Sequence, residues 1–225
     1  MPRTVHSFFL PGPAGKLEAL WEQSPPARAD LVALVCHPHP LYGGTLHNKV
    51  VHHTARALQE LGLAVLRFNF RGAGRSQGKH DQGRGEADDV RAALAWLEKK
   101  APAAGVALAG FSFGAWVGLR VGCGDARVGA LIGVGLPAND SDFSFLAGCS
   151  KPKLFVQGTR DQFGSPGAVE ALAARAAPPK ELVWVEDADH FFAGRLEELR
   201  RAIRDHFPLP LPERDMQIPR PPASG

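Results

Sequence analysis

Short apolar runs alternate with longer amphipathic stretches along most of the chain. Residues 31–36 form a continuous apolar run between polar neighbours, which is typical of a strand that is buried on both faces. Similar runs follow at 64–70, 106–111, 130–135, 153–157 and 181–185, and stretches with helical patterning occupy 50–61, 86–100, 113–121, 168–176 and 195–207. This alternation predicts an α/β domain, with a mostly parallel sheet and helices on both of its faces.

The two ends of the chain depart from this alternation. Residues 4–10 and 16–21 flank a Pro-Gly-Pro-Ala-Gly turn at 11–15, which predicts an antiparallel hairpin at the edge of the sheet. The segment 208–225 is rich in proline and has no periodic apolar face, so we expect a flexible, extended tail. The length of 225 residues accommodates one sizeable domain, which we assign to residues 1–207.

Composition narrows the class of protein. The net charge of +3 is small, and the basic residues near the C-terminus are interleaved with acidic ones, so nothing favours a nucleic-acid partner. Cys36, Cys123 and Cys149 are odd in number and lack metal-ligand spacing, which indicates a reducing compartment and no structural metal. No apolar run is long enough for a signal peptide or a membrane span. We therefore expect a cytoplasmic protein without a membrane partner or a cofactor, in an oligomeric state that the sequence leaves open.

The pentapeptide GFSFG at 110–114 links a predicted strand to a predicted helix. A G-x-S-x-G sequence in that context places its serine on a sharp turn with the side-chain oxygen exposed, because the glycines allow strand and helix to approach closely. Ser112 is therefore the candidate nucleophile of an acyl-transfer hydrolase. A second match at 74–78 is followed by a loop-like sequence where a helix should begin, so we assign Ser76 no catalytic role.

A serine hydroxyl needs a base that accepts its proton and an acid that orients the base. Asp161 and His190 each follow directly after a later predicted strand, in the chain order that this class of hydrolase requires. Asp187 and Asp189 are alternatives for the acid, although both are local neighbours of His190. The sequence thus predicts a catalytic triad of Ser112, Asp161 and His190.

The developing oxyanion of an acyl-transfer reaction needs backbone N–H donors. The residue after the nucleophile, Phe113, is one expected donor. The other is expected in the loop after the first buried strand, where His39 is the first choice and Leu41 the second, because the prolines of this loop have no N–H. Leu41, Tyr42 and Phe143 are candidates for the substrate pocket, although core packing explains each of them almost as well.

Together these motifs resemble the α/β-hydrolase fold superfamily, and in particular a compact bacterial branch of serine hydrolases with little or no lid. The resemblance spans about residues 4–207 and rests on CHPHPLYGGTLHNKVV at 36–51, RFNFRGAGRSQG at 67–78, GRGEADD at 83–89, GFSFG at 110–114, VQGTRD at 156–161 and DADHFF at 187–192. It implies a structural role for the R-G-x-G-x-S loop that contains Ser76. The chain departs from the family pattern at Asn69, where many members have aspartate, and at Pro38, which occupies the glycine position of the common H-G-x loop.

Many members of the superfamily insert a helical lid after the sixth strand, whereas residues 135–150 are too short for one. The resemblance and the candidate triad therefore imply an open site. They imply a serine hydrolase that acts on short-chain carboxylic esters through an acyl-enzyme on Ser112, with a small acyl compound and water as its partners. Thioesterase, lactonase and peptidase activities use the same machinery and stay open.

Two other classes of function remain as alternatives. A hydrolase-like protein that binds a ligand without turnover would keep the fold, since fold does not fix function. A metal-dependent hydrolase would use His37 and His39, but His52 and His53 are predicted on different faces of a helix and no second cluster with ligand spacing follows. We therefore expect His37 and His39 to shape the oxyanion loop.

Overall fold

A computed structural model describes residues 4–23 and 28–207, and the predicted tail at 208–225 lies outside this range. Within it, eight strands form one sheet in the order β1-β2-β4-β3-β5-β6-β7-β8. The strands are β1 Thr4–Gly12, β2 Gly15–Gln23, β3 Leu31–Cys36, β4 Ala64–Phe68, β5 Gly105–Phe111, β6 Val128–Val134, β7 Lys153–Gly158 and β8 Lys180–Val185. The helices are α1 Lys49–Glu60, α2 Arg84–Lys100, α3 Phe113–Gly124, α4 Pro166–Arg175 and α5 Leu196–Asp205, with short 3₁₀ helices η1 Pro40–Tyr42 and η2 Ser144–Gly148.

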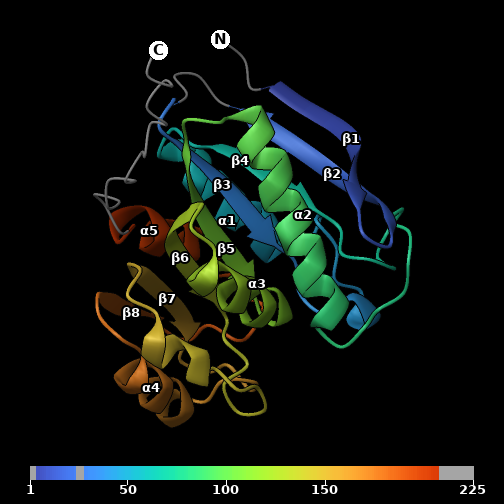
Figure 1. Ribbon diagram of the computed structural model, residues 1–225. Coiled ribbons are helices and arrows are strands. Elements are labelled where there is room, and N and C mark those ends of the chain that lie inside the picture. The colour runs from blue at the N-terminus through green and yellow to red at the C-terminus, as the bar shows by residue number, and fades with distance from the viewer. Residues whose placement is uncertain (1–3, 24–27, 208–225) are drawn as a thin grey trace, which may run out of the picture.

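The sheet is mixed at one edge and parallel elsewhere. Strand β2 pairs antiparallel with both β1 and β4, and each later pair is parallel. Helices α1 and α5 contribute to the core on one face, and α2 and α3 to the core on the other (Figure 1). Of the described residues, those between β6 and β7 form only the short η2 helix, and no described helix is long and apolar enough to cross a membrane. The predicted α/β-hydrolase fold without a helical lid is confirmed.

The apolar runs become buried strands for the expected reason. Every residue of β3 and β7 is buried, because helices cover both faces of the sheet there. Strand β8 is different: it lies at the edge, and only its last residue, Val185, is fully buried. Helix α2 begins at Arg84, two residues before its predicted start, because the Glu86 carboxylate accepts a hydrogen bond from the N–H of Gly83 (2.8 Å) and fixes the first turn.

The loop after β4 explains the second G-x-S-x-G match. The Ser76 hydroxyl donates to the carbonyl of Asn69 (2.7 Å) and accepts from the N–H of Glu18 (2.9 Å). The Asn69 side chain in turn donates to the Glu18 carboxylate and accepts from the N–H of Leu46, each at 2.7 Å. Ser76 therefore ties the hairpin to the segment that follows β4, and the Asn69 side chain extends this connection to the loop that follows β3. The role of Ser76 is structural.

Candidate active site

The nucleophile candidate lies on a strained turn between β5 and α3. Ser112 has φ 55° and ψ −121°, a left-handed conformation that is rare for any residue other than glycine. A Cβ on Gly110 would lie 2.3 Å from the carbonyl oxygen of Gly114, and a Cβ on Gly114 would lie 2.3 Å from that of His37. Only glycine fits at either position, so the turn requires the G-x-S-x-G pattern that marks it in the sequence.

The three residues of the predicted triad meet at the carboxyl ends of the parallel strands. Nε2 of His190 lies 2.9 Å from Oγ of Ser112, and Nδ1 of His190 lies 2.8 Å from Oδ2 of Asp161. An ionised carboxylate only accepts hydrogen bonds, so Nδ1 carries the proton and Nε2 is free to accept from the serine hydroxyl. Both His190 and Asp161 are 3% exposed, which limits competition from water for these bonds.

The two alternative acids are engaged elsewhere. The carboxylate of Asp187 pairs with Arg160 at 2.6 Å. The carboxylate of Asp189 accepts hydrogen bonds from the N–H groups of Phe191 (3.0 Å) and Ala193 (2.9 Å) and so shapes the loop that carries the histidine. Neither aspartate competes with Asp161 for the imidazole.

A buried glutamine that the sequence analysis missed holds the acid in place. Nε2 of Gln157 donates to Oδ2 of Asp161 (2.8 Å), the same oxygen that faces the histidine, and its Oε1 accepts from the N–H of Leu136 (2.7 Å). The other oxygen, Oδ1, accepts from the N–H groups of Phe163 (2.8 Å) and Gly164 (3.2 Å). One signal pointed to Gln157: it is a polar residue that directly follows the apolar centre of a fully buried strand.

Replacing Gln157 with leucine is expected to lower kcat by about tenfold to hundredfold, with little change in KM, because the acid loses one of the donors that fix its orientation. Steady-state kinetics on a short ester measure both constants. Gln162→Leu is the matched control, since that glutamine is exposed and lies next to Asp161 in the chain. Equal losses in the two variants, or an unchanged kcat in a folded Gln157→Leu protein, would contradict a positioning role.

The candidate oxyanion donors lie on two different elements. Phe113 is the first residue of α3, so its N–H has no acceptor within the helix. The N–H of Leu41 donates to Nδ1 of the His39 ring (3.3 Å), which favours the backbone of His39 over Leu41 as the second donor. The loop turns back at Gly44, where a Cβ would lie 2.1 Å from the carbonyl oxygen of Pro38. The loop thus has its tight turn without the glycine that the common H-G-x pattern carries.

The fully buried His37 fixes the start of this loop. Its Nδ1 donates to the carbonyl of Pro38 (2.6 Å), and its Nε2 accepts from the N–H of Phe70 (2.9 Å). Burial lowers the pKa of His37 to about 3, so the ring stays neutral and keeps this tautomer near neutral pH. Both ring nitrogens are occupied by the backbone, which agrees with a shaping role. No group of three or more His, Cys, Asp or Glu residues in 4–23 and 28–207 is arranged to hold a metal ion.

The three candidate pocket residues lie in different environments. Leu41 and Tyr42 are exposed on η1, beside the candidate oxyanion donor. Phe143 is buried and packs against Phe145, with ring centroids 5.7 Å apart. It lines a cavity of about 200 Å³ to which no triad residue contributes. Phe143 is therefore a core residue, which was the alternative to a role in the substrate pocket.

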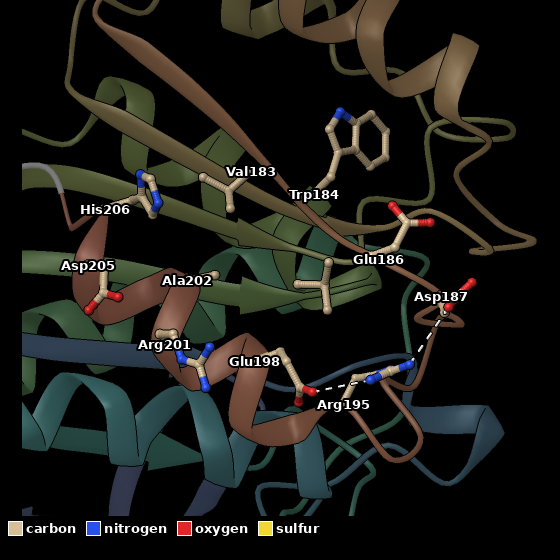
Figure 2. Close-up of a pocket in the computed structure, with 11 residues that line it drawn as sticks. Val183, Trp184, Glu186, Asp187, Arg195, Glu198, Arg201, Ala202, Asp205 and His206 are labelled. Carbon is tan, nitrogen blue, oxygen red and sulfur yellow. Dashed lines mark hydrogen bonds and ion pairs between the residues drawn. The ribbon is translucent and has the colours of Figure 1, made fainter.

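A larger cavity of about 470 Å³ lies between β8 and α5 (Figure 2). Val183 and Trp184 line its strand side, and Arg195 pairs with Glu198 (3.3 Å) and Asp187 (3.7 Å) at one end. None of the triad residues lines this cavity. It is therefore separate from the candidate active site.

The sheet order, the strained serine after β5 and the histidine loop after β8 place the chain in the α/β-hydrolase class of proteins. The family model described as an alpha/beta hydrolase domain matches residues 39–202, and the chain belongs to this family. An uncharacterized protein of Rickettsia prowazekii is 38% identical over 209 residues, which cover 89% of this chain and 87% of that protein.

Two solved structures are similar to this chain over nearly its full length. An α/β serine hydrolase homologue from Coxiella burnetii has a TM-score of 0.86 at 40% identity, covering 90% of this chain and 97% of its own. A protein from Xanthomonas campestris, described as an α/β serine hydrolase without a lid, has a TM-score of 0.83 at 38% identity. The match covers 95% of this chain and 98% of that protein. These similarities agree with the fold and with the absence of a helical lid among the described residues.

Proposed function

We propose that the protein is a serine hydrolase that cleaves short-chain carboxylic esters through an acyl-enzyme on Ser112. The observation that carries this proposal is the unbroken hydrogen-bonded series from the serine hydroxyl through His190 to the carboxylate of Asp161, at 2.9 and 2.8 Å. A base within hydrogen-bond reach of the nucleophile, itself oriented by a buried acid, is the arrangement that activates a serine.

In the proposed mechanism, Nε2 of His190 accepts the Ser112 proton as Oγ attacks the ester carbonyl. The N–H groups of Phe113 and His39 donate hydrogen bonds to the oxyanion of the tetrahedral intermediate. The imidazolium, stabilised by Asp161, then protonates the leaving alcohol, and the acyl group stays on the serine. A water molecule that gives its proton to the same imidazole attacks the acyl-enzyme and releases the carboxylic acid.

Two observations support a small substrate. The connection from β6 to β7 carries only η2, so no described helix encloses a long acyl chain. The similar protein from Xanthomonas campestris is likewise described as lacking a lid. Thioesters, lactones and peptide bonds pass through the same kind of tetrahedral intermediate, so a substrate panel has to separate these reaction types.

Reaction with a fluorophosphonate probe tests the proposal directly. We expect one equivalent of probe to attach to the protein, and peptide mass spectrometry to place it on Ser112. Hydrolysis of ethyl acetate is expected to persist in a strong chelator and to stop when the probe has reacted. A folded protein that takes up no probe and turns over no ester, thioester, lactone or amino-acid anilide would instead support the non-catalytic binding alternative. Loss of activity in the chelator would support the alternative of a metal-dependent hydrolase.

A further inference from the structure

Exposed apolar side chains gather around the candidate active site. Six large apolar side chains are exposed among the described residues, and two of them, Val5 and Phe9, lie on the edge strand β1. The other four lie on loops at the carboxyl ends of β3, β7 and β8: Leu41 (69% exposed), Tyr42 (87%), Phe163 (42%) and Phe191 (51%). We call these four residues the apolar rim.

The apolar rim contacts the proposed catalytic groups directly. On one side, the ring centroids of Phe163 and Phe191 lie 4.6 and 5.3 Å from that of His190. On the other side, the Tyr42 ring lies 4.7 Å from His39, a candidate oxyanion donor. Single exposed apolar residues are ordinary, but a group of them around a reactive centre marks a ligand-binding surface.

The chemistry of the reaction assigns the two sides to different parts of an ester. The carbonyl oxygen has to lie at the oxyanion donors, beside Tyr42 and Leu41. The leaving oxygen has to lie within hydrogen-bond reach of Nε2 of His190, because this nitrogen returns the proton to it. The alcohol part of the ester therefore extends toward the rings of Phe163 and Phe191.

Resting on the proposed function, we infer that the site selects esters of aromatic alcohols, with the alcohol ring packed against Phe163 and Phe191. Aromatic rings attract one another in offset and edge-to-face arrangements beyond their buried area, whereas a saturated ring of the same size gains only the area. A flat ring also loses little conformational freedom on an open surface, unlike a long flexible chain.

Matched esters test this inference without a change of acyl group. Benzyl acetate and cyclohexylmethyl acetate have leaving alcohols of similar size and acidity, and we expect kcat/KM to be roughly threefold to tenfold higher for benzyl acetate. Phe191→Leu and Phe163→Leu each keep an apolar side chain and remove the ring, so each should bring this ratio toward one. Phe9→Leu is the matched control, because Phe9 is an exposed ring on β1, and it should leave the ratio unchanged.

Three outcomes would overturn the inference. A wild-type ratio near one, with ethyl acetate still hydrolysed and Ser112 still labelled, contradicts the aromatic preference and leaves the proposed function standing. A preference for methyl phenylacetate over methyl cyclohexylacetate that exceeds the benzyl preference and survives both rim substitutions contradicts the assignment to the alcohol side. Absence of both ester turnover and probe labelling contradicts the proposed function, and this inference with it.

Discussion

The substitution Ser112→Ala is expected to lower kcat for a short ester by about a million-fold and to leave the fold intact. The hydroxyl is the only group of the proposed triad that forms a bond to the substrate, so its loss leaves the oxyanion donors and substrate binding alone to assist water. Alanine keeps the Cβ of serine, so it adds no strain at the turn. Steady-state kinetics and a thermal melt of the same preparation measure the two effects.

Ser76→Ala is the matched control, because Ser76 is the centre of the second G-x-S-x-G match. It loses the bonds to Asn69 and Glu18, so the melting temperature should fall while kcat stays within about twofold of the wild type. A Ser112→Ala protein that keeps more than about a tenth of the wild-type kcat, or a Ser76→Ala protein that loses turnover while folded, would place the chemistry elsewhere.

The alternation of short apolar runs and helical stretches predicted an α/β domain with a mostly parallel sheet, and the motifs at the strand ends supplied the resemblance to the α/β-hydrolase fold. A strand that is buried on both faces carries mostly apolar side chains, so β3 is visible as an uninterrupted apolar run and β7 as a short apolar run between Lys153 and Gln157. The strained turn at Ser112 was equally predictable, because its close backbone approach requires glycine at two fixed positions. Such local requirements leave a mark in the sequence that needs no knowledge of distant partners.

Features that depend on distant partners left weaker marks. Gln157 bonds to Leu136 and Asp161, and pattern alone does not distinguish such a residue from a polar strand end. Phe191 and Phe192 are identical neighbours in the sequence, but only Phe192 is buried, whereas Phe191 is 51% exposed. The exposed ring of Phe191 is the one that lies beside the imidazole.

A buried ion pair also depends on a partner that is distant in the sequence. Arg67 lies within the apolar run of β4, and its guanidinium pairs with the Glu22 carboxylate at 2.7 Å while donating to the carbonyl of Leu46. Burial lowers the pKa of Arg67 to about 10, and it stays charged at neutral pH. The pair joins β2, β4 and the loop after β3. The charge was visible in the sequence, but its partner, on a different strand, was not.

The substitution Asp161→Asn is expected to lower kcat by about ten-thousand-fold, because the surroundings of the carboxylate fix which way an amide must point. Oδ1 accepts from two backbone N–H groups, those of Phe163 and Gly164, whereas Oδ2 accepts from one donor besides the histidine, Nε2 of Gln157, so the oxygen of the amide has to stay at the Oδ1 position. The NH₂ group then faces Nδ1 of His190. The histidine has to accept at Nδ1 and carry its proton on Nε2. Nε2, the nitrogen that faces Ser112, then has no lone pair to accept the serine proton.

Asp189→Asn is the matched control for this tautomer argument. Oδ1 of Asp189 accepts two backbone N–H groups in the histidine loop, and an asparagine oxygen preserves both bonds, so kcat should stay within about threefold of the wild type. Fluorophosphonate labelling should slow in parallel with turnover in Asp161→Asn, since both reactions need the same proton transfer. Loss of turnover with labelling at the wild-type rate would show that the acid acts after acylation, and the assigned tautomer would then be wrong.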